Sequence, residues 1–219
     1  AEIYTFKSKI SKRWVKDRVV IAGDSAHLSP PFLGQGMCAG LRDVSSLSWR
    51  VKSILSGNFR ISPLLAYQNE RFSHVSEFIK LAVKCGKIMS DPEIIFKSNK
   101  KKDDNLFDFP RPKISTQLNT DCQLSGSLLP QFVEKGKRTD DKLGYRFVLI
   151  CLEKNYDILE EAKKQSIHVA AASGKLKAWI SNFNKVALLV RPDKYILGSA
   201  KNKKELRRLL NDFSHFETQ

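Results

Sequence analysis

The sequence lacks several features that would assign it to a familiar class. Its 219 residues include four cysteines, none in a CxxC pair, which excludes a disulfide framework and a CxxC redox centre. No run approaches the ~20 apolar residues that span a bilayer, and residues 1–10 contain no apolar signal core. With 11 glycines and 8 prolines, the chain is neither collagen-like nor of low complexity. We therefore expect a globular, cytoplasmic protein with no membrane partner.

Basic residues are in excess of acidic ones. The 38 Lys and Arg and 23 Asp and Glu give a net charge of +15, which makes an anionic partner the first to consider. The charge is split almost evenly, with +8 over residues 1–112 and +7 over residues 113–219. A nucleic-acid groove usually needs a contiguous basic stripe with stacking aromatic side chains. We expect solvated basic faces and no nucleic-acid partner.

The first 36 residues predict a strand followed by a stiff loop. The apolar run VVIA at residues 19–22 ends at Gly23 and predicts a strand buried on both faces. The loop LSPPFLGQG at residues 28–36 is rigid at its two prolines and conformationally free at its two glycines.

Two helices are expected next. Apolar residues recur in steps of three and four over residues 37–55, which predicts a helix with one apolar face that stops at Gly57. Ser62 and Pro63 form the start signal of a longer helix that ends near Met89. The apolar stripe of that helix comprises Leu64, Tyr67, Phe72, Val75, Phe78, Ile79, Ala82 and Val83.

A linker and a second domain follow. Residues 91–112 combine prolines with runs of Lys and Asp and predict a linker. The later pattern predicts strands at 145–152, 167–172, 186–190 and 194–199, and helices at 155–165, 176–183 and 205–213. This order is typical of an α/β sandwich about the size of a thioredoxin.

The segment from Gly23 to Met37 has the layout of a ligand site. Asp24 follows the predicted strand, and Gly34 and Gly36 precede the predicted helix. Ligands gather at the carboxyl ends of strands, and a helix start offers unpaired N–H groups with partial positive charge. A helix-capping loop with a solvated aspartate explains the spacing equally well.

The same residues resemble a known family. The motifs GDSAH at 23–27, PP at 30–31, GQGM at 34–37, GLRD at 40–43 and LSW at 47–49 are together similar to the second flavin fingerprint of the FAD-dependent aromatic hydroxylases. The sequence YQNER at 67–71 resembles a helix start of that family. The motifs LKAW at 176–179 and LLVRPD at 188–193 resemble the tail of the 3-(3-hydroxyphenyl)propionate and phenol hydroxylase branch.

The resemblance implies an α/β chain with a defined domain order. Residues 1–90 would form the C-terminal part of an FAD-binding, glutathione-reductase-like domain, with the long helices. Residues 91–112 would form the linker, and residues 113–219 a thioredoxin-like domain. The activity implied is hydroxylation of a phenolic substrate by a flavoprotein monooxygenase that uses tightly bound FAD, NAD(P)H and O2.

The resemblance also implies a set of cofactor-binding residues. Asp24 would bind the ribityl chain of FAD, and the amides of Gly36, Met37 and Cys38 would face the pyrimidine edge of the flavin. The complete set is Gly23, Asp24, Pro31, Gly34, Gln35, Gly36, Met37 and Cys38. No side chain is nominated as catalytic, and no metal site is expected.

Departures from the family pattern leave a second interpretation open. No GxGxxG motif occurs, so the adenosine-diphosphate part of the flavin site is missing. The chain is therefore interpreted as the C-terminal portion of a longer enzyme, inactive by itself. The alternative is a non-catalytic interaction or oligomerisation module derived from such an enzyme, with a second copy of the chain as its partner. Lys194 also stands where the family's RPD turn often has glycine.

The remaining chemistry-bearing residues predict structural roles. The four histidines are isolated in the sequence, and His27 is expected to fix its loop by a hydrogen bond. The cysteines are interpreted as core residues and the tryptophans as packing anchors. Arg42 and Asp43, the latter interpreted as a first-turn acid, are expected to hold the helix in place.

Overall fold

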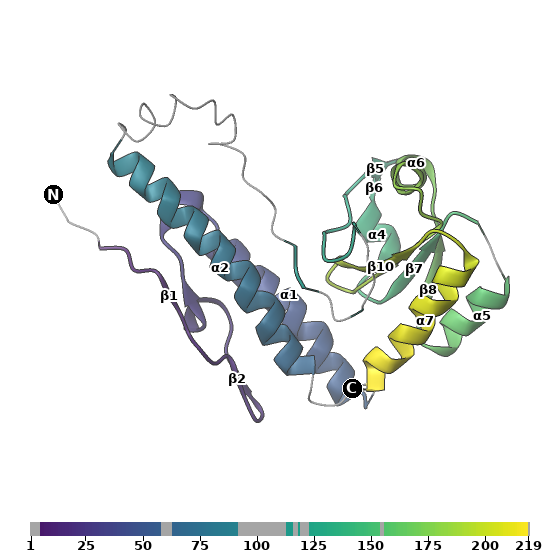
Figure 1. The fold of residues 1–219 in the computed structure, drawn as a ribbon, viewed down its shortest axis with the longest axis horizontal. Coiled ribbons are helices and arrows are strands. Elements are labelled where there is room, and N and C mark those ends of the chain that lie inside the picture. Colours follow the sequence, from purple (N-terminus) through teal and green to yellow (C-terminus); the bar gives the residue numbers. More distant parts are fainter. Residues whose placement is uncertain are drawn as a thin grey trace. The chain divides into compact units, whose positions relative to one another are not determined.

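The computed structural model of the chain describes residues 5–57, 63–91, 113–115, 118, 123–153 and 156–218. The chain divides into two compact units, the first made of residues 1–47 and 67–112 and the second of residues 48–66 and 113–219. Figure 1 shows the helices and strands and labels most of them. Apart from Asp91, the predicted linker at 91–112 lies outside the described residues. The proposed domain boundaries therefore stay predictions.

Short strands and two long helices build the first unit. Strands β1 (Lys9–Ile10) and β4 (His27–Leu28) form one antiparallel pair, and β2 (Val15–Lys16) and β3 (Val19–Val20) form another. The 3₁₀ turns η1 (Gly23–Ser25) and η2 (Pro31–Leu33) follow β3 and β4. Helix α1 (Gly36–Leu55) contributes its residues up to 47, and helix α2 (Pro63–Ser90), which begins at the predicted proline, contributes its residues from 67 onward.

The strand expected at residues 19–22 is shorter and more exposed than predicted. Its regular part, β3, has two residues, and the side chain of Val19 is 67% exposed. Among the described residues, the only strand that pairs with β3 is β2, in a two-stranded hairpin. Burial on both faces requires a covering layer on each side of the strand, and the exposed side chain of Val19 shows that one side of β3 is uncovered among the described residues. The prediction of a fully buried strand is therefore wrong for this chain.

Helix α1 confirms the predicted helix, but the residues that it buries lie outside the predicted apolar face. The exposed side chains include Met37 (77%), Leu41 (61%), Val44 (58%) and Leu55 (82%), which are members of the apolar face. The buried residues of the same helix are Ala39, Asp43, Ser46, Trp49 and Arg50. Helix α2 differs, since five of its predicted stripe residues are buried, namely Leu64, Tyr67, Val75, Ile79 and Ala82.

The second unit contains a four-stranded mixed sheet in the order β10–β9–β7–β8. The strands are β7 (Val148–Cys151), β8 (His168–Ala171), β9 (Ala187–Val190) and β10 (Ile196–Ala200). Strand β8 runs parallel to β7, and the other two pairs are antiparallel. Helices α5 (Tyr156–Lys164), α6 (Gly174–Asn182) and α7 (Lys203–Thr218) confirm the predicted alternation. The α/β class of the chain is therefore confirmed.

A hairpin and a short helix in this unit were not predicted. Strands β5 (Val133–Glu134) and β6 (Lys137–Arg138) pair with each other and lead into α4 (Thr139–Leu143). Glu134 accepts a hydrogen bond from the amide of Lys175 at 2.6 Å, close to the start of α6. Two-residue strands leave almost no periodic pattern in a sequence, so their position could not be read from alternation.

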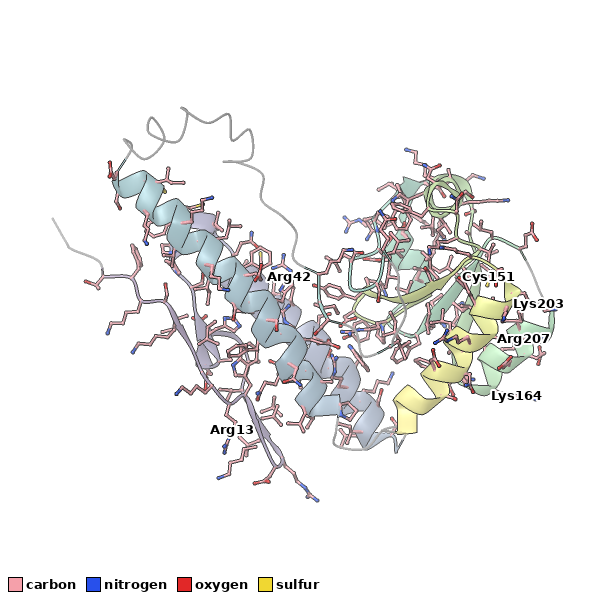
Figure 2. The ribbon with its side chains drawn as sticks, viewed as in Figure 1. Arg13, Arg42, Cys151, Lys164, Lys203 and Arg207 are labelled. Carbon is pink, nitrogen blue, oxygen red and sulfur yellow. The ribbon has the colours of Figure 1, made fainter. Side chains whose placement is uncertain are left out.

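Basic side chains stand on the surfaces of the helices. Figure 2 shows Lys203 and Arg207 on α7 and Lys164 at the end of α5. All three are exposed, while the apolar residues of the same helices face the sheet. Among the described residues, no helix is both long and apolar enough to cross a membrane.

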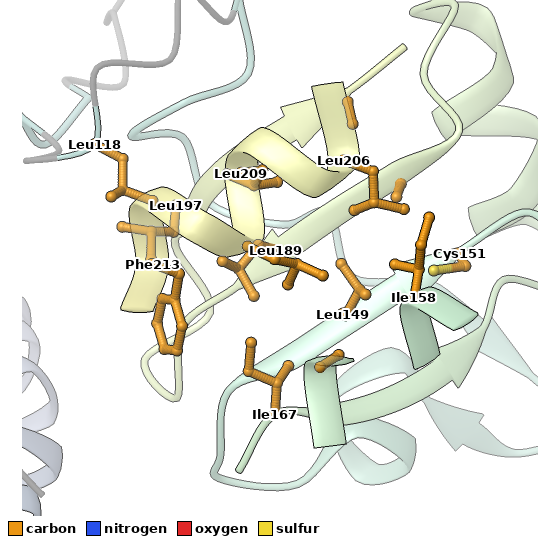
Figure 3. Close-up of a cluster of buried hydrophobic side chains, with 14 of the residues drawn as sticks. Leu118, Leu149, Cys151, Ile158, Ile167, Leu189, Leu197, Leu206, Leu209 and Phe213 are labelled. Atoms are coloured by element: carbon orange, nitrogen blue, oxygen red, sulfur yellow. The ribbon is translucent and has the colours of Figure 1, made fainter. Parts of the chain in front are cut away.

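Two apolar clusters lie on opposite faces of the sheet. Leu149 and Cys151 of β7 belong to the cluster that contains residues of α5 and α7 (Figure 3). Val148 and Ile150 belong to the other cluster, which contains Leu176 and Ile180 of α6. This alternation along one strand is the two-residue period of a sheet covered on both faces. Burial raises the pKa of the Cys151 thiol to about 11, as befits a packed cysteine.

Candidate flavin site

The turn at Gly23 to Ser25 is fixed by a buried carboxylate of helix α1. Gly23 has a φ of +58°, a left-handed conformation that glycine adopts without steric cost. Its N–H donates to Oδ2 of Asp43 at 3.0 Å. A Cβ added to Gly40 would lie 3.5 Å from the Cα of Gly23, so turn and helix are in close contact. Asp24, the second residue of η1, is exposed and carried by this anchored turn.

Asp43 is the centre of a buried charged network. Its side chain is inaccessible to solvent and lies 2.7 Å from Nε2 of His27 and 2.7 Å from Nε of Arg71. Arg71 also donates through Nη1 to Nδ1 of His74 at 2.8 Å and through Nη2 to the carbonyl of Ala39 at 3.3 Å. The network therefore joins the η1–β4 segment to both long helices.

The network keeps Asp43 ionised. Burial opposes ionisation, but the hydrogen bond from His27 and the charge and hydrogen bond of Arg71 outweigh it. With the Gly23 amide, they hold the pKa of the Asp43 carboxyl below its ordinary value. Asp43 is the eighth residue of α1 rather than a first-turn acid. Its predicted structural role is confirmed, but the reason given for it was wrong.

Two histidines that are isolated in the sequence meet in this network. A guanidinium group can only donate, so Nδ1 of His74 accepts from Arg71 and any proton lies on Nε2. The Asp43 carboxylate accepts from Nε2 of His27, which confirms that His27 fixes its loop by a hydrogen bond. Nδ1 of His27 is buried and has no partner in the described structure.

The YQNER motif ties helix α2 to the segment before the turn. Oε1 of Gln68 accepts the amides of Trp14 and Val15 at 2.7 and 3.1 Å. The hydroxyl of Tyr67 donates to the carbonyl of Ile21 at 3.2 Å. Through Gln68 and Tyr67, the motif binds α2 to β2 and to Ile21, the residue after β3. Through Arg71, the last residue of the motif, α2 binds Asp43, which in turn binds the η1 turn.

The Pro-Pro loop is held by helix α2 as well. Pro31 begins η2, and Gly34 closes it with a φ of +60° and an N–H that donates to the Pro31 carbonyl at 2.8 Å. The ring of Phe32 occupies the space where a Cβ of Gly86 would stand, within 2.3 Å. Glycine at position 86 therefore lets α2 receive this ring and position the loop.

The N-terminus of α1 is open to a ligand. Among the described residues, the N–H groups of Gly36, Met37 and Cys38 donate to no backbone carbonyl, whereas that of Ala39 donates to Gln35. The first turn carries no acidic side chain that would neutralise the positive end of the helix. A Cβ at Gly34 or Gly36 would meet no atom within 4 Å. Gln35 points back instead, and its Oε1 accepts from Arg42 at 3.3 Å.

Five of the eight predicted site residues, from Gly23 to Gln35, thus lie in two loops held by the same pair of helices, and the other three begin helix α1. Cofactor contacts of these residues stay predictions. Sequence reasoning missed the supporting residues His74, Arg71 and Gly86, although Arg71 lies within a motif that it quoted. The local sequence pattern could not predict the role of Gly86, because its partner, Phe32, is 54 residues away. No cluster of three or more metal-ligating side chains occurs in the described part of the chain.

Comparison with known proteins gives two family matches. Residues 1–82 match the family described as "FAD binding domain", and residues 131–216 match the family described as "HcaD C-terminal domain". A probable NADH-specific resorcinol 4-hydroxylase of Rhodococcus jostii is 28% identical over 95% of this chain and 45% of its own length. A 3-(3-hydroxy-phenyl)propionate/3-hydroxycinnamic acid hydroxylase of Burkholderia vietnamiensis is 44% identical over 82 residues, which are 37% of this chain and 15% of that protein.

Solved structures share the fold. The rebeccamycin biosynthetic enzyme RebC with reduced flavin aligns with a TM-score of 0.74 and 18% identity over 94% of this chain and 46% of its own. The anhydrotetracycline hydroxylase OxyS of Streptomyces rimosus aligns with a TM-score of 0.72 and 23% identity, also over 94% of this chain and 46% of its own.

The matches show a segment similar to an FAD-binding domain at residues 1–82, followed by a segment similar to the HcaD C-terminal domain at residues 131–216. More particularly, the chain is similar in sequence to hydroxylases named for resorcinol and for 3-(3-hydroxy-phenyl)propionate and 3-hydroxycinnamic acid. It spans a little under half of the resorcinol hydroxylase, at 45% of that length. This coverage fits the expected correspondence to a C-terminal portion.

Proposed function

We propose that this chain holds the flavin end of FAD in a monooxygenase that hydroxylates a phenolic ring with NAD(P)H and O2. The observation that carries the proposal is the open N-terminus of α1, which lies next to a turn pinned by Asp43. Three unpaired amides on a long helix suit the negatively charged edge of a reduced flavin. The names of the relatives, which include phenolic hydroxylases and one NADH-specific enzyme, support the substrate class and the reductant.

Each predicted site residue has a role that its chemistry allows. The exposed carboxylate of Asp24 accepts hydrogen bonds from ribityl hydroxyls. The amides of residues 36–38 form a preorganised dipole that does not titrate and needs no reorganisation during the reaction. Pro31, which has no N–H and a fixed φ, forms a rigid wall beside the phenolic substrate. An added Cβ at Gly36 would meet no protein atom within 4 Å, so an alanine there would leave the amides in place.

The cofactor would supply the redox and oxygen chemistry. The chain's own contribution is then orientation and electrostatics, because no side chain in the two loops is placed to act as a general base. Activity of the whole enzyme would also require the dinucleotide-binding motif that this sequence does not contain.

The second unit is assigned a thioredoxin-like fold as part of this proposal. Its order, strand–helix–strand–helix–hairpin–helix, and its sheet order β10–β9–β7–β8 support the assignment. Without a CxxC pair, its function would be structural. A cytoplasmic location stays a prediction that rests on the absence of a cysteine framework.

Flavin titration of the 219-residue chain tests the proposal. FAD and FMN should bind with similar affinity, because the expected contacts lie at the flavin end, and adenosine monophosphate should not compete. Asp24→Ala should remove binding. Gly36→Pro deletes one amide at a helix position where proline is tolerated, and should weaken binding about tenfold, the equivalent of one lost hydrogen bond.

Gly36→Ala is the matched control, because it keeps the amide and adds a Cβ that meets no atom within 4 Å. Fluorescence quenching of the flavin measures all variants. Full affinity in both Asp24→Ala and Gly36→Pro, or no binding of either flavin to the parent chain, contradicts the proposal.

One observation favours the alternative of an interaction module. The exposed side chains of Met37, Leu41, Val44 and Leu55 make an apolar face on α1. Exposed apolar faces often mark contact with another protein. Sedimentation of the chain at increasing concentration would detect a homodimer, and strictly monomeric behaviour would remove this alternative.

A further inference from the structure

Two sequence motifs that lie far apart meet in the second unit. Nε1 of Trp49, in α1, donates to Oδ2 of Asp193 at 3.1 Å across 144 residues of sequence. Asp193 belongs to the RPD turn between β9 and β10. Arg191 of the same turn binds Asp193 through Nε at 3.0 Å and Nη2 at 2.6 Å.

The contact is fully buried and strongly oriented. Trp49 is 2% exposed, Arg191 is 1% exposed and Asp193 is 8% exposed. Burial opposes ionisation of Asp193, but the charge and hydrogen bonds of Arg191, with Arg50 and Trp49, hold the pKa of its carboxyl below the ordinary value. The guanidinium of Arg191 lies 5.2 Å from the centre of the Trp49 ring, within cation–π range. Arg191 holds the Asp193 carboxylate through two hydrogen bonds, and the carboxylate accepts a third from the indole N–H of Trp49. These three bonds fix the distance and the direction of the indole.

Helix α1 is also built into the core of the sheet. Trp49 belongs to the same apolar cluster as Leu149, Leu189 and Phe213, and Ile54 packs against it. The Phe147 ring meets the indole edge to face, with centroids 5.3 Å apart. Ser48 and Tyr145 add a hydrogen bond of 2.7 Å. The C-terminal half of α1 therefore has a defined position in the second unit.

The same helix runs without a break from Trp49 back to Gly36, a distance of about 20 Å at 1.5 Å per residue. A buried ion pair adds little net stability, and its best attested use is to fix one arrangement among several. We propose that the Arg191–Asp193 turn is a positioning element for helix α1. By binding Trp49, it stabilises the helix whose first amides, at residues 36–38, belong to the proposed flavin site, and in this respect the inference rests on the proposed function.

Hydrogen exchange of the complete chain, followed by mass spectrometry, tests the contact between Trp49 and the RPD turn without any flavin. Trp49→Phe keeps the ring and deletes the N–H donor. Asp193→Asn keeps an acceptor and deletes the charge that Arg191 needs. Each change should speed exchange of the amides of residues 39–47 about tenfold, because local opening of α1 becomes easier. Exchange in the strand β7 should change less than twofold.

Trp179→Phe is the matched control, since it makes the same change on α6, in the same unit. It should leave residues 39–47 unaffected. The double variant Trp49→Phe with Asp193→Asn should exchange no faster than the faster single variant, because both remove one shared contact. If Trp49→Phe also accelerates exchange of the β7 amides, the protein core is disturbed. The exchange of residues 39–47 in Asp193→Asn then decides whether the turn positions α1.

The inference is overturned if both variants speed amide exchange only in the second unit, or if neither variant speeds exchange anywhere. Flavin titration of the same proteins separates it from the proposed function. A chain that shows the exchange effect but binds no flavin refutes the proposed function alone. A chain whose flavin affinity and α1 exchange are both untouched by Trp49→Phe and Asp193→Asn refutes the positioning role alone.

Discussion

Different interactions stabilise the interior of each of the two units. In the first, the residues that fix the loops are polar and buried, with Asp43, Arg71 and His27 at the centre. In the second, every residue of β7, β9 and β10 is buried, and apolar clusters cover both faces of the sheet. Hydrophobic burial is non-directional and supplies stability, whereas charge-assisted hydrogen bonds fix direction. The difference teaches that buried charged groups fix the loops of the first unit, whereas apolar burial is the main support of the sheet in the second.

Removing Asp43 should give the largest effect. Asp43→Leu leaves the buried guanidinium of Arg71 without its anion, and breaking a buried pair in this way costs about 3–5 kcal/mol. We expect the free energy of unfolding to fall by that amount in urea titrations followed by circular dichroism. The double variant Asp43→Leu with Arg71→Met should recover part of the loss, because no uncompensated charge remains.

The second unit supplies the contrast for this prediction. Leu149→Ala deletes apolar volume in a core without charge, which usually costs about 2–5 kcal/mol. No substitution of a neighbour by a small residue should rescue it. A rescue pattern shared by both sites would show that the distinction between the units is wrong.

Acid should produce a smaller loss, which depends on the charged groups. The folded-state pKa values of Asp43 and Asp193 lie below their ordinary values. Their contribution to stability is therefore complete above the unfolded pKa of about 3.9 and disappears as the pH falls through the folded values. Urea midpoints measured between pH 2 and pH 6 should fall mainly below about pH 4.

The variant Asp43→Asn tests which unit responds. It removes one of the two depressed carboxyls and should flatten the acid dependence of the first unit. An unchanged pH profile in that variant would mean that Asp43 does not contribute through its charge.

The smallest effect is expected at the contact between helix and turn. Gly40→Ala places its Cβ 3.5 Å from the Cα of Gly23, an ordinary contact distance. Alanine also gains about 1 kcal/mol of helix propensity over glycine, so stability should change by less than about 1 kcal/mol. The variant Gly40→Val should be distinctly worse in the same urea titration. Equal stability of the two would show that the turn does not pack closely on α1.

Much of the fold could be predicted from local pattern. The strands and helices of the second unit agree with their predicted ranges to within a few residues at most boundaries, because alternation and 3.6-residue periodicity are strong there. The start of α2 at Pro63 followed from its N-cap signal. The short strands β1, β2, β5 and β6 could not be predicted, since two residues carry no period.

Much less of the supporting structure could be predicted. Periodicity shows that α1 has two faces, but not which one is covered, and the structure buries the side of Ala39, Asp43 and Arg50. The hydrogen-bond partners of Asp43 lie 16 to 28 residues away in sequence, and that of Trp49 lies 144 residues away. Such contacts depend on how distant segments pack together, which a local sequence pattern does not predict.

The sequence by itself determined the order of the main strands and helices, the α/β class and the loops that are proposed to hold a flavin. These depend on residue type and spacing, which act over a few neighbouring residues. Only the tertiary structure decided that Asp43, Arg71 and His27 share one buried network and that the RPD turn binds the indole of Trp49. Burial and charge pairing are properties of segments brought together by folding, so they appear only once the chain has packed.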